Sequence, residues 1–291
     1  MTGLSLALVL LSAVAHVTWN LLLKRSRNKE VFVWGLLATT SVLLCPLGIA
    51  LLWFNPIHQR GWWFVLSTVV LHIFYFVLLG RAYARADLSL IYPIARGTGP
   101  MLVPVLAVAI LGETVSWPAA VGIVAIILGV HNVSWWGNFH RLARQPLAFL
   151  KNSGTGYALL TGLTIAAYTL VDKKGVGYVQ PFLYMYLMTL GAAAGLASYI
   201  VHKHGVAVIR SEWRASAVPM VAAGLLTFLA YGLVLTALTL SRVSYVAPAR
   251  EVGIVVAVLI GVFVLKEPFG VGRLLGSSLI VLGLVLITLA P

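Results

Sequence analysis

The chain is a succession of apolar runs, each long enough to cross a lipid bilayer as a helix. About 20 consecutive apolar residues span the hydrocarbon core of a bilayer, and 61% of the 291 residues are hydrophobic while only 9% are charged. No soluble domain has an interior large enough for that much apolar surface. We therefore predict an all-α membrane protein of ten transmembrane helices, at residues 3–23, 31–54, 62–84, 89–111, 117–136, 154–171, 181–201, 217–240, 244–265 and 270–290.

The two halves of the sequence look like copies of each other. SAVAHVTWNLLLKRS (12–26) aligns with TGLTIAAYTLVDKKG (161–175), and farther on Ala95–Arg96 aligns with Ala249–Arg250 at an offset of 154 residues. A glutamate and two glycines recur at the same offset, because Glu113, Gly122 and Gly129 match Glu267, Gly276 and Gly283. Chance similarity between apolar segments is the alternative, but several polar and glycine matches at one offset argue against it.

Each copy contains five of the expected spans. The first repeat covers 1–136, the connecting loop 137–153, and the second repeat 154–291. Because five is an odd number, the second copy enters the membrane from the opposite side, and the two copies form an inverted repeat. We expect these inverted five-helix repeats to surround a central cavity.

Lysine and arginine concentrate in alternate loops between the expected spans. The odd-numbered loops hold 14 of these residues and the even-numbered loops hold 4. Loops rich in lysine and arginine stay in the cytoplasm, so we expect a multi-pass inner-membrane protein with both termini on the non-cytoplasmic side. The N-terminal MTGLSLALVL has no basic region before its apolar stretch, which favours a first span over a cleaved signal peptide.

Two arginines lie inside the expected spans at matching places, Arg96 in IYPIARG and Arg250 in YVAPARE. An arginine at a helix centre costs about 2.5–3.5 kcal/mol on insertion scales, so such residues usually face a protein interior or an aqueous cavity. Each follows a proline within three residues, Pro93 or Pro248, and proline bends or breaks a helix. Snorkelling of the guanidinium to the headgroup region is the alternative. A charged group beside a broken helix in both copies is typical of the substrate site of a transporter.

The residues around these arginines indicate the class of ligand. A guanidinium offers a planar fork of donors that matches a carboxylate or a phosphate, so Arg96 and Arg250 favour an anionic or zwitterionic substrate. Glu251 either neutralises Arg96 as an ion pair or carries a proton during transport. Aromatic side chains combine apolar area with a hydrogen-bonding tip, and the candidates for the rest of the lining are Trp19, Tyr168, Tyr75, Tyr92 and Tyr231, together with His16 and Asn20.

The order of the motifs resembles the drug/metabolite transporter (DMT) superfamily, in particular its ten-helix, two-repeat EamA-type members. The motifs are HVTWNLLLKRS in the first span, YPIARG and LGE at the two ends of the fourth, and their echoes APAREVG, LKEP and GRLLGSSLIVLG in the second half. Two positions depart from the repeat, since Lys266 stands opposite Gly112 and Tyr168 opposite Trp19. The resemblance implies a basket of helices that moves a small metabolite by alternating access, and it favours export.

Several classes of protein are disfavoured by what the sequence lacks. It contains no GxSxG, HExxH or phosphate-loop motif, and its seven acidic residues are scattered, so we expect no enzymatic activity, no cofactor and no metal. The net charge of +13 comes mainly from the basic loops, so nucleic acid is not expected as a partner. The expected partners are a small-molecule substrate and membrane lipids, with a monomer as the working unit and a dimer as the alternative.

We therefore predict a secondary transporter that exports a small polar metabolite, anionic or zwitterionic, such as an amino acid or an organophosphorus compound. An exporter of cationic drugs is one alternative, and a membrane enzyme or lipid-handling protein is another. The first expected span has no carboxylate, whereas the small multidrug branch of the superfamily binds cations through a carboxylate in its first helix. The drug-exporter alternative is therefore the weaker reading.

Overall fold

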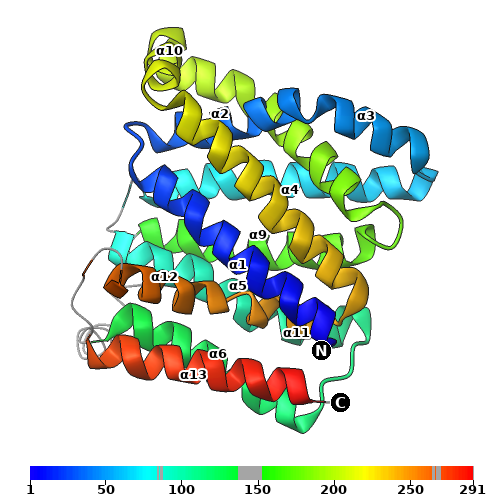
Figure 1. Ribbon diagram of the computed structural model, residues 1–291, viewed down its shortest axis with the longest axis vertical. Helices are drawn as coiled ribbons and strands as arrows, with labels where there is room; N and C mark the ends of the chain where they lie inside the picture. Colours follow the sequence, from blue (N-terminus) through cyan, green and yellow to red (C-terminus); the bar gives the residue numbers. More distant parts are fainter. Residues whose placement is uncertain (84, 86–87, 137–152, 264–265, 267–269, 291) are drawn as a thin grey trace. The chain divides into compact units, whose positions relative to one another are not determined.

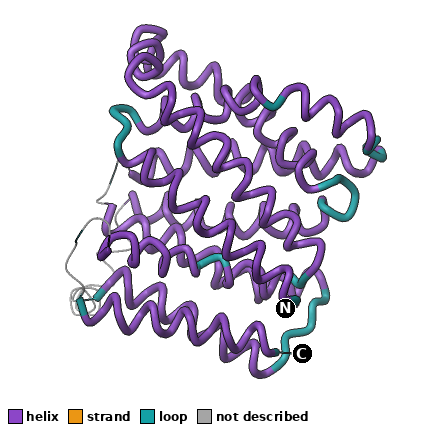
Figure 2. Tube along the Cα trace, in the orientation of Figure 1, coloured by secondary structure: helices purple, strands orange, loops and turns teal. Residues whose placement is uncertain are grey.

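The computed structural model describes residues 1–83, 85, 88–136, 153–263, 266 and 270–290, and these residues form helices joined by short turns, with no strand among them (Figure 2). This confirms the predicted all-α fold class. The helices, labelled in Figure 1, are α1 (Gly3–Lys24), α2 (Lys29–Leu43), α3 (Cys45–Phe54), α4 (Gln59–Tyr83), α5 (Leu88–Leu111), α6 (Trp117–Trp135), α9 (Ser153–Gly175), α10 (Pro181–Leu240), α11 (Val243–Ala249), α12 (Val252–Phe263) and α13 (Val271–Leu289).

The described helices are long and apolar enough to cross a membrane several times. Seven helical stretches meet this condition by length and composition, or eight if α2 and α3, which bend by 58° at their junction, form one span. Pro46 stands at the start of α3, where the missing N–H of a proline prevents α2 from continuing unbroken. The chain is therefore an integral multi-pass membrane protein.

The predicted ten spans exceed this number chiefly because of α10. This helix runs for 60 residues, about 90 Å at 1.5 Å per residue, whereas the hydrocarbon core of a bilayer is about 30 Å thick. Its backbone leaves the helical region at Gly205 (φ 76°) and at Ser216, between the expected seventh and eighth spans. The expected fourth span corresponds to α5, Leu88–Leu111, of which only Gly97–Leu111 enters this count. The count of ten stays a prediction.

The helices form two compact units, and each unit takes segments from both halves of the sequence. Unit 1 consists of Met1–Leu10, Phe74–Leu170 and Leu240–Pro291, and unit 2 consists of Leu11–Ile73 and Val171–Thr239. In each half, the middle stretch belongs to unit 2 and the flanking stretches belong to unit 1. The two halves are thus divided in the same way, as two copies of one repeat should be.

In unit 1, α6 and α13 lie side by side and pack through paired glycines (Figure 1). A Cβ on Gly122 would lie 2.6 Å from the Gly283 carbonyl oxygen, and a Cβ on Gly129 would lie 2.6 Å from the Gly276 carbonyl oxygen. The earlier glycine of one helix meets the later glycine of the other, so the two helices are antiparallel. Because Gly122 matches Gly276 and Gly129 matches Gly283 in the sequence repeat, a local pseudo-twofold axis relates the pair, as in an inverted repeat.

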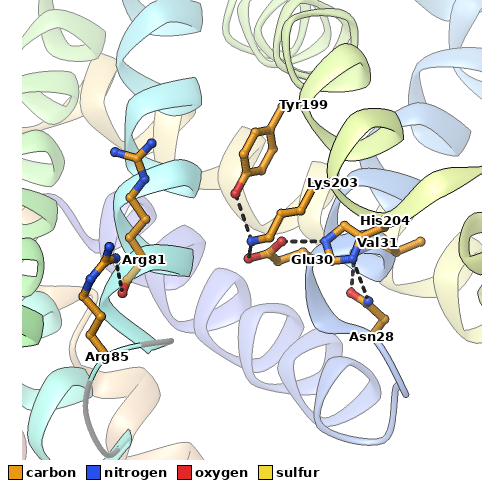
Figure 3. Close-up of polar contacts among 8 residues, drawn as sticks. All are labelled: Asn28, Glu30, Val31, Arg81, Arg85, Tyr199, Lys203 and His204. Carbon is orange, nitrogen blue, oxygen red and sulfur yellow. Dashed lines mark hydrogen bonds and ion pairs between the residues drawn. The ribbon is translucent and has the colours of Figure 1, made fainter.

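In unit 2, a cluster of polar side chains fastens the start of α2 to α10 (Figure 3). Glu30 accepts a hydrogen bond from Lys203 Nζ at 2.8 Å and pairs with His204 Nε2 at 2.7 Å. Asn28 caps α2, because its side-chain oxygen accepts a hydrogen bond from the Val31 N–H at 3.1 Å. Partly exposed ion pairs of this kind contribute about 0–1 kcal/mol each, so the cluster fixes the position of α2 more than it stabilises the unit.

Candidate functional site

The site in unit 1 is organised by a break in the helix that carries Arg250. α11 ends at Ala249 and α12 begins at Val252, and Arg250 and Glu251 form the turn between them, visible as an interruption of the helix in Figure 2. The Glu251 N–H donates to the Pro248 carbonyl at 3.0 Å, which is the three-residue spacing of a 3₁₀ turn. The Arg250 N–H still donates to the Val246 carbonyl at 3.2 Å, and the Gly253 N–H donates to the Arg250 carbonyl at 3.1 Å, so the turn is a local change from four-residue to three-residue spacing.

Arg250 and Glu251 line a pocket together with parts of α5, α9 and α11. The lining residues are Gly99, Pro100, Val103, Ile165, Tyr168, Thr169, Ala247, Arg250 and Glu251. Glu251 is only 5% exposed, so the pocket gathers a cation, a buried carboxylate, a phenol and a hydroxyl among apolar groups. Its volume of about 20 Å³ has room for about one water molecule. The pocket as it stands is therefore too small to hold a metabolite.

Tyr168 forms the aromatic side of the pocket, and a second tyrosine packs against it. Tyr168, from α9, is 7% exposed, and its ring meets the ring of Tyr75, from α4, edge to face with the centroids 6.0 Å apart. Edge-to-face pairs contribute about 0.5–1.5 kcal/mol beyond the area they bury. The pair therefore holds the Tyr168 ring in place against the pocket.

Four of the predicted site residues are thus brought together in unit 1, namely Arg250, Glu251, Tyr168 and Tyr75. Arg96 and Tyr92 belong to α5, which also contributes Gly99 to the pocket, but their side chains lie outside the described part of the structure. The expected break beside each arginine occurs in the second copy only.

The helix of the first copy, α5, is continuous from Leu88 to Leu111. Its proline, Pro93, stands five residues after the first helical residue, as Pro248 does in α11, so the proline alone does not produce the break. The two copies differ at the residue after the arginine, where Gly97 stands opposite Glu251. The expectation of a broken helix in both copies was therefore wrong for the first copy.

The remaining predicted residues lie in unit 2. On α1, Trp19 Nε1 donates to His16 Nδ1 at 3.2 Å, and Asn20 Nδ2 donates to the His16 carbonyl at 2.7 Å. The Trp19 and His16 side chains thus interact with each other, while Asn20 bonds to the backbone of the same turn of helix. Tyr231, on α10, donates its hydroxyl to Asp172.

Sequence reasoning missed Asp172. The expected sixth span ends at residue 171, so Asp172 and the two lysines after it were assigned to a loop. Instead α9 continues to Gly175, and Asp172 is fully buried, with 0% of its surface exposed. The sequence feature that could have indicated Asp172 is its place at the end of an apolar run, in a chain that has only seven acidic residues.

Glu113, the glutamate of the LGE motif, has a structural role that the sequence did not reveal. Its carboxylate accepts hydrogen bonds from the backbone N–H groups of Val243 at 2.9 Å and Ser244 at 3.0 Å, and from the Ser244 hydroxyl at 2.6 Å. A carboxylate at this position satisfies N–H groups that have no partner inside the helix. Glu113 therefore anchors the start of α11, the short helix that leads to Arg250.

Comparison with known proteins gives the class of protein that this fold and site define. The chain belongs to the EamA-like transporter family, whose model matches residues 3–135 and 152–289. This confirms the resemblance to the drug/metabolite transporter superfamily and the two-repeat architecture. A solved structure titled "Crystal structure of protein" is similar with a TM-score of 0.73, covering 97% of this chain and 98% of its own at 16% identity, which shows the fold alone. No curated protein matches the sequence.

Proposed function

We propose that the protein is a secondary transporter that exports a small anionic or zwitterionic metabolite, such as an amino acid, by alternating access. The observation that carries this proposal is Arg250, which stands on a helix break and lines a pocket with Tyr168 and the buried Glu251. Membership of a transporter family supports the transport step. The pocket supplies the chemistry for the substrate class.

Within this class, the pocket suits a zwitterion best. The Arg250 guanidinium binds the substrate carboxylate with two parallel hydrogen bonds, and the neighbouring Glu251 carboxylate attracts its ammonium group. Tyr168 packs against the remainder of the molecule. A lipophilic cation would gain from Glu251 but would be repelled by Arg250, so a cationic drug is the poorer fit.

Opening of the pocket requires a part that moves, and the turn at Arg250–Glu251 is the natural hinge. The backbone hydrogen bonds change there from four-residue to three-residue spacing, whereas the start of α11 is held by Glu113. Movement of α12 about this turn widens the pocket while α11 stays in place. Hinges are commonly a few residues at the ends of helices that absorb the change in backbone angles.

The membrane arrangement belongs to the same proposal. Counting α2 with α3 as one span, α11 with α12 as one, and α10 as two on either side of its kink gives ten spans, five in each repeat of 1–136 and 154–291. We propose further that the protein lies in the inner membrane with both termini on the non-cytoplasmic side. It works as a monomer and has no enzymatic activity. Accessibility of the single Cys45 to membrane-impermeant maleimides from each side of the membrane tests the orientation.

A thermal-shift screen of the purified protein tests the substrate class. A ligand that binds only the folded state raises the melting temperature by mass action, so we expect stabilisation by amino acids or phosphonates, lost in Arg250→Ala. Arg60→Ala is the matched control, because Arg60 is exposed at the start of α4 in unit 2. Stabilisation by quaternary amines alone, or stabilisation by amino acids that survives in Arg250→Ala, would overturn the proposal.

A further inference from the structure

Unit 2 contains a carboxylate that the substrate pocket does not use. Asp172, in the last turn of α9, is fully buried, and its carboxylate faces hydroxyl groups from two distant stretches of α10. Tyr184 donates to Asp172 Oδ1 at 3.0 Å, and Tyr231 donates to Asp172 Oδ2. A buried acidic residue inside a membrane helix is by default a candidate for a functional site, because its cost is otherwise unexplained.

The hydrogen bonds of Tyr184 allow Asp172 to exist in two protonation states. The Tyr184 hydroxyl has one proton but two acceptors within reach, Asp172 Oδ1 at 3.0 Å and the Phe64 carbonyl at 3.1 Å. When Asp172 is ionised, Tyr184 donates to it. When Asp172 carries a proton, Asp172 donates to the Tyr184 oxygen and Tyr184 donates to Phe64 instead. Neither state leaves a buried donor or acceptor unsatisfied, which would cost about 1–3 kcal/mol.

The groups that face Asp172 extend to a histidine on α4. The Thr68 hydroxyl lies 3.1 Å from His72 Nδ1, and the same nitrogen lies 2.9 Å from the Thr68 carbonyl oxygen. His72 is itself buried, at 6% exposed, and its ring meets the Tyr231 ring edge to face with the centroids 5.7 Å apart. A second titratable group, His72, therefore lies against Tyr231, one of the two tyrosines that donate to Asp172.

Two lysines follow Asp172 directly in the sequence. Lys173 Nζ donates to the Leu238 carbonyl at 2.6 Å, and Lys174 is exposed. The ion pairs between described residues are those of Glu30 with Lys203 and His204, and they do not include Asp172.

We propose that Asp172 is the proton-binding site that couples transport to the proton gradient across the membrane. One proton from the water on one side of the membrane binds the carboxylate, Tyr184 turns from Asp172 to Phe64, and the proton later returns to the water on the other side. α9 carries both Asp172 and the pocket residue Tyr168, so one helix serves both sites. This inference rests on the proposed transport function, and the experiments below separate the two.

Infrared difference spectroscopy of the full chain in lipid vesicles tests the proton site without any substrate. The carbonyl stretch of a protonated carboxylic acid is resolved from the bands of carboxylates, and we expect a pH-dependent band of this kind in the wild-type protein. It should vanish in Asp172→Asn, shift in Tyr184→Phe and persist in the control Glu30→Gln. A band that survives in Asp172→Asn, or no such band in the wild-type protein, would overturn the proposal.

Proteoliposomes test the coupling, with radiolabelled alanine, glutamate and methylphosphonate as probes. A difference of about one pH unit supports about tenfold accumulation of a solute that exchanges for one proton. We expect Asp172→Asn to lose this accumulation while it still exchanges labelled for unlabelled probe, since exchange needs no net proton movement. Accumulation that persists in Asp172→Asn would contradict the coupling. If the wild-type protein moves none of the three probes, the proposed substrate class fails, and the infrared result still decides the proton site.

Discussion

The pocket around Arg250 in unit 1 and the surroundings of Asp172 in unit 2 differ in how far they enclose an ionisable side chain. Arg250 lies on a helix break, half-buried, in a pocket that also exposes a phenol and a carboxylate. Asp172 lies inside a continuous helix and is enclosed, with tyrosine hydroxyls of its own protein on both carboxylate oxygens.

The difference teaches which kind of ligand each region can take. A side chain whose hydrogen bonds are filled by the protein has no room for a molecule, but it can still gain or lose a proton. A guanidinium at the edge of a pocket, beside a hinge, can exchange its hydrogen bonds within the protein for hydrogen bonds to a substrate. A metabolite site and a proton site therefore need different architectures, and we propose that the pocket in unit 1 is the first and Asp172 in unit 2 the second.

Replacing Arg250 should have the largest effect, because it removes the charge that anchors the substrate. We expect Arg250→Ala to weaken binding of an anionic or zwitterionic ligand by about 2–5 kcal/mol, the cost of truncating one partner of a buried charge pair. Titration of the purified protein by isothermal calorimetry measures this loss. Arg250→Lys should recover part of the affinity, since the charge returns without the fork, and Arg60→Ala should bind as the wild-type protein does.

Filling the glycine contact between α6 and α13 should damage unit 1 and leave the surroundings of Asp172 intact. In Gly129→Leu, the new Cβ would lie 2.6 Å from the Gly276 carbonyl oxygen, and overpacking of this kind typically costs about 1–3 kcal/mol. Gly156→Ala on α9 is the control, because a Cβ there meets nothing within 4 Å. Melting of both variants in detergent measures the effect, and equal melting temperatures would contradict the packing.

Removing one tyrosine hydroxyl should weaken unit 2 without affecting the pocket in unit 1. We expect Tyr231→Phe to cost about 1–3 kcal/mol of stability, because a buried Asp172 oxygen then lacks its donor. Denaturation in detergent measures the loss, and binding of the pocket ligand serves as the reference. A change in ligand affinity larger than the change in stability would show that the two regions do not act separately.

The smallest effect is expected at Glu113. Glu113→Gln keeps the shape of the side chain but loses charge and one acceptor at the start of α11, where loss of a capping group costs about 1 kcal/mol. We expect a lower melting temperature and faster amide exchange at Val243 and Ser244, measured by hydrogen–deuterium exchange. Unchanged exchange at these two residues would refute the anchoring role.

The helical architecture was predictable because hydropathy reveals the membrane-spanning runs. The repeat was predictable because matching residues recur at a constant spacing. Runs of about 20 apolar residues specify helices in a bilayer, and the offset of 154 residues that matches Gly122 with Gly276 corresponds to an antiparallel contact in unit 1. The break at Arg250 was predicted from Pro248. The same reasoning from Pro93 was wrong for α5, because a proline weakens a helix at one bond and the neighbouring residues decide whether the helix breaks.

The buried carboxylate was beyond sequence reasoning for a physical reason. Asp172 is followed by two lysines, so its hydropathy is that of a loop, and only the packing of α10 against α9 encloses it. The partners of Glu113 were equally hidden, since Val243 and Ser244 lie about 130 residues away in the chain. Contacts between residues so far apart in the chain can be found only from the three-dimensional structure, because local sequence periodicity does not reveal them.

Counterflow in proteoliposomes is the measurement that tests the assignment of Arg250 most directly. Vesicles loaded with unlabelled alanine or glutamate are placed in trace label, and entry of the label is followed for the wild-type protein, Arg250→Ala and Arg60→Ala. We expect saturable entry of label with the wild-type protein and with Arg60→Ala, and none with Arg250→Ala at equal protein content and melting temperature. Undiminished counterflow in Arg250→Ala would show that the substrate binds elsewhere.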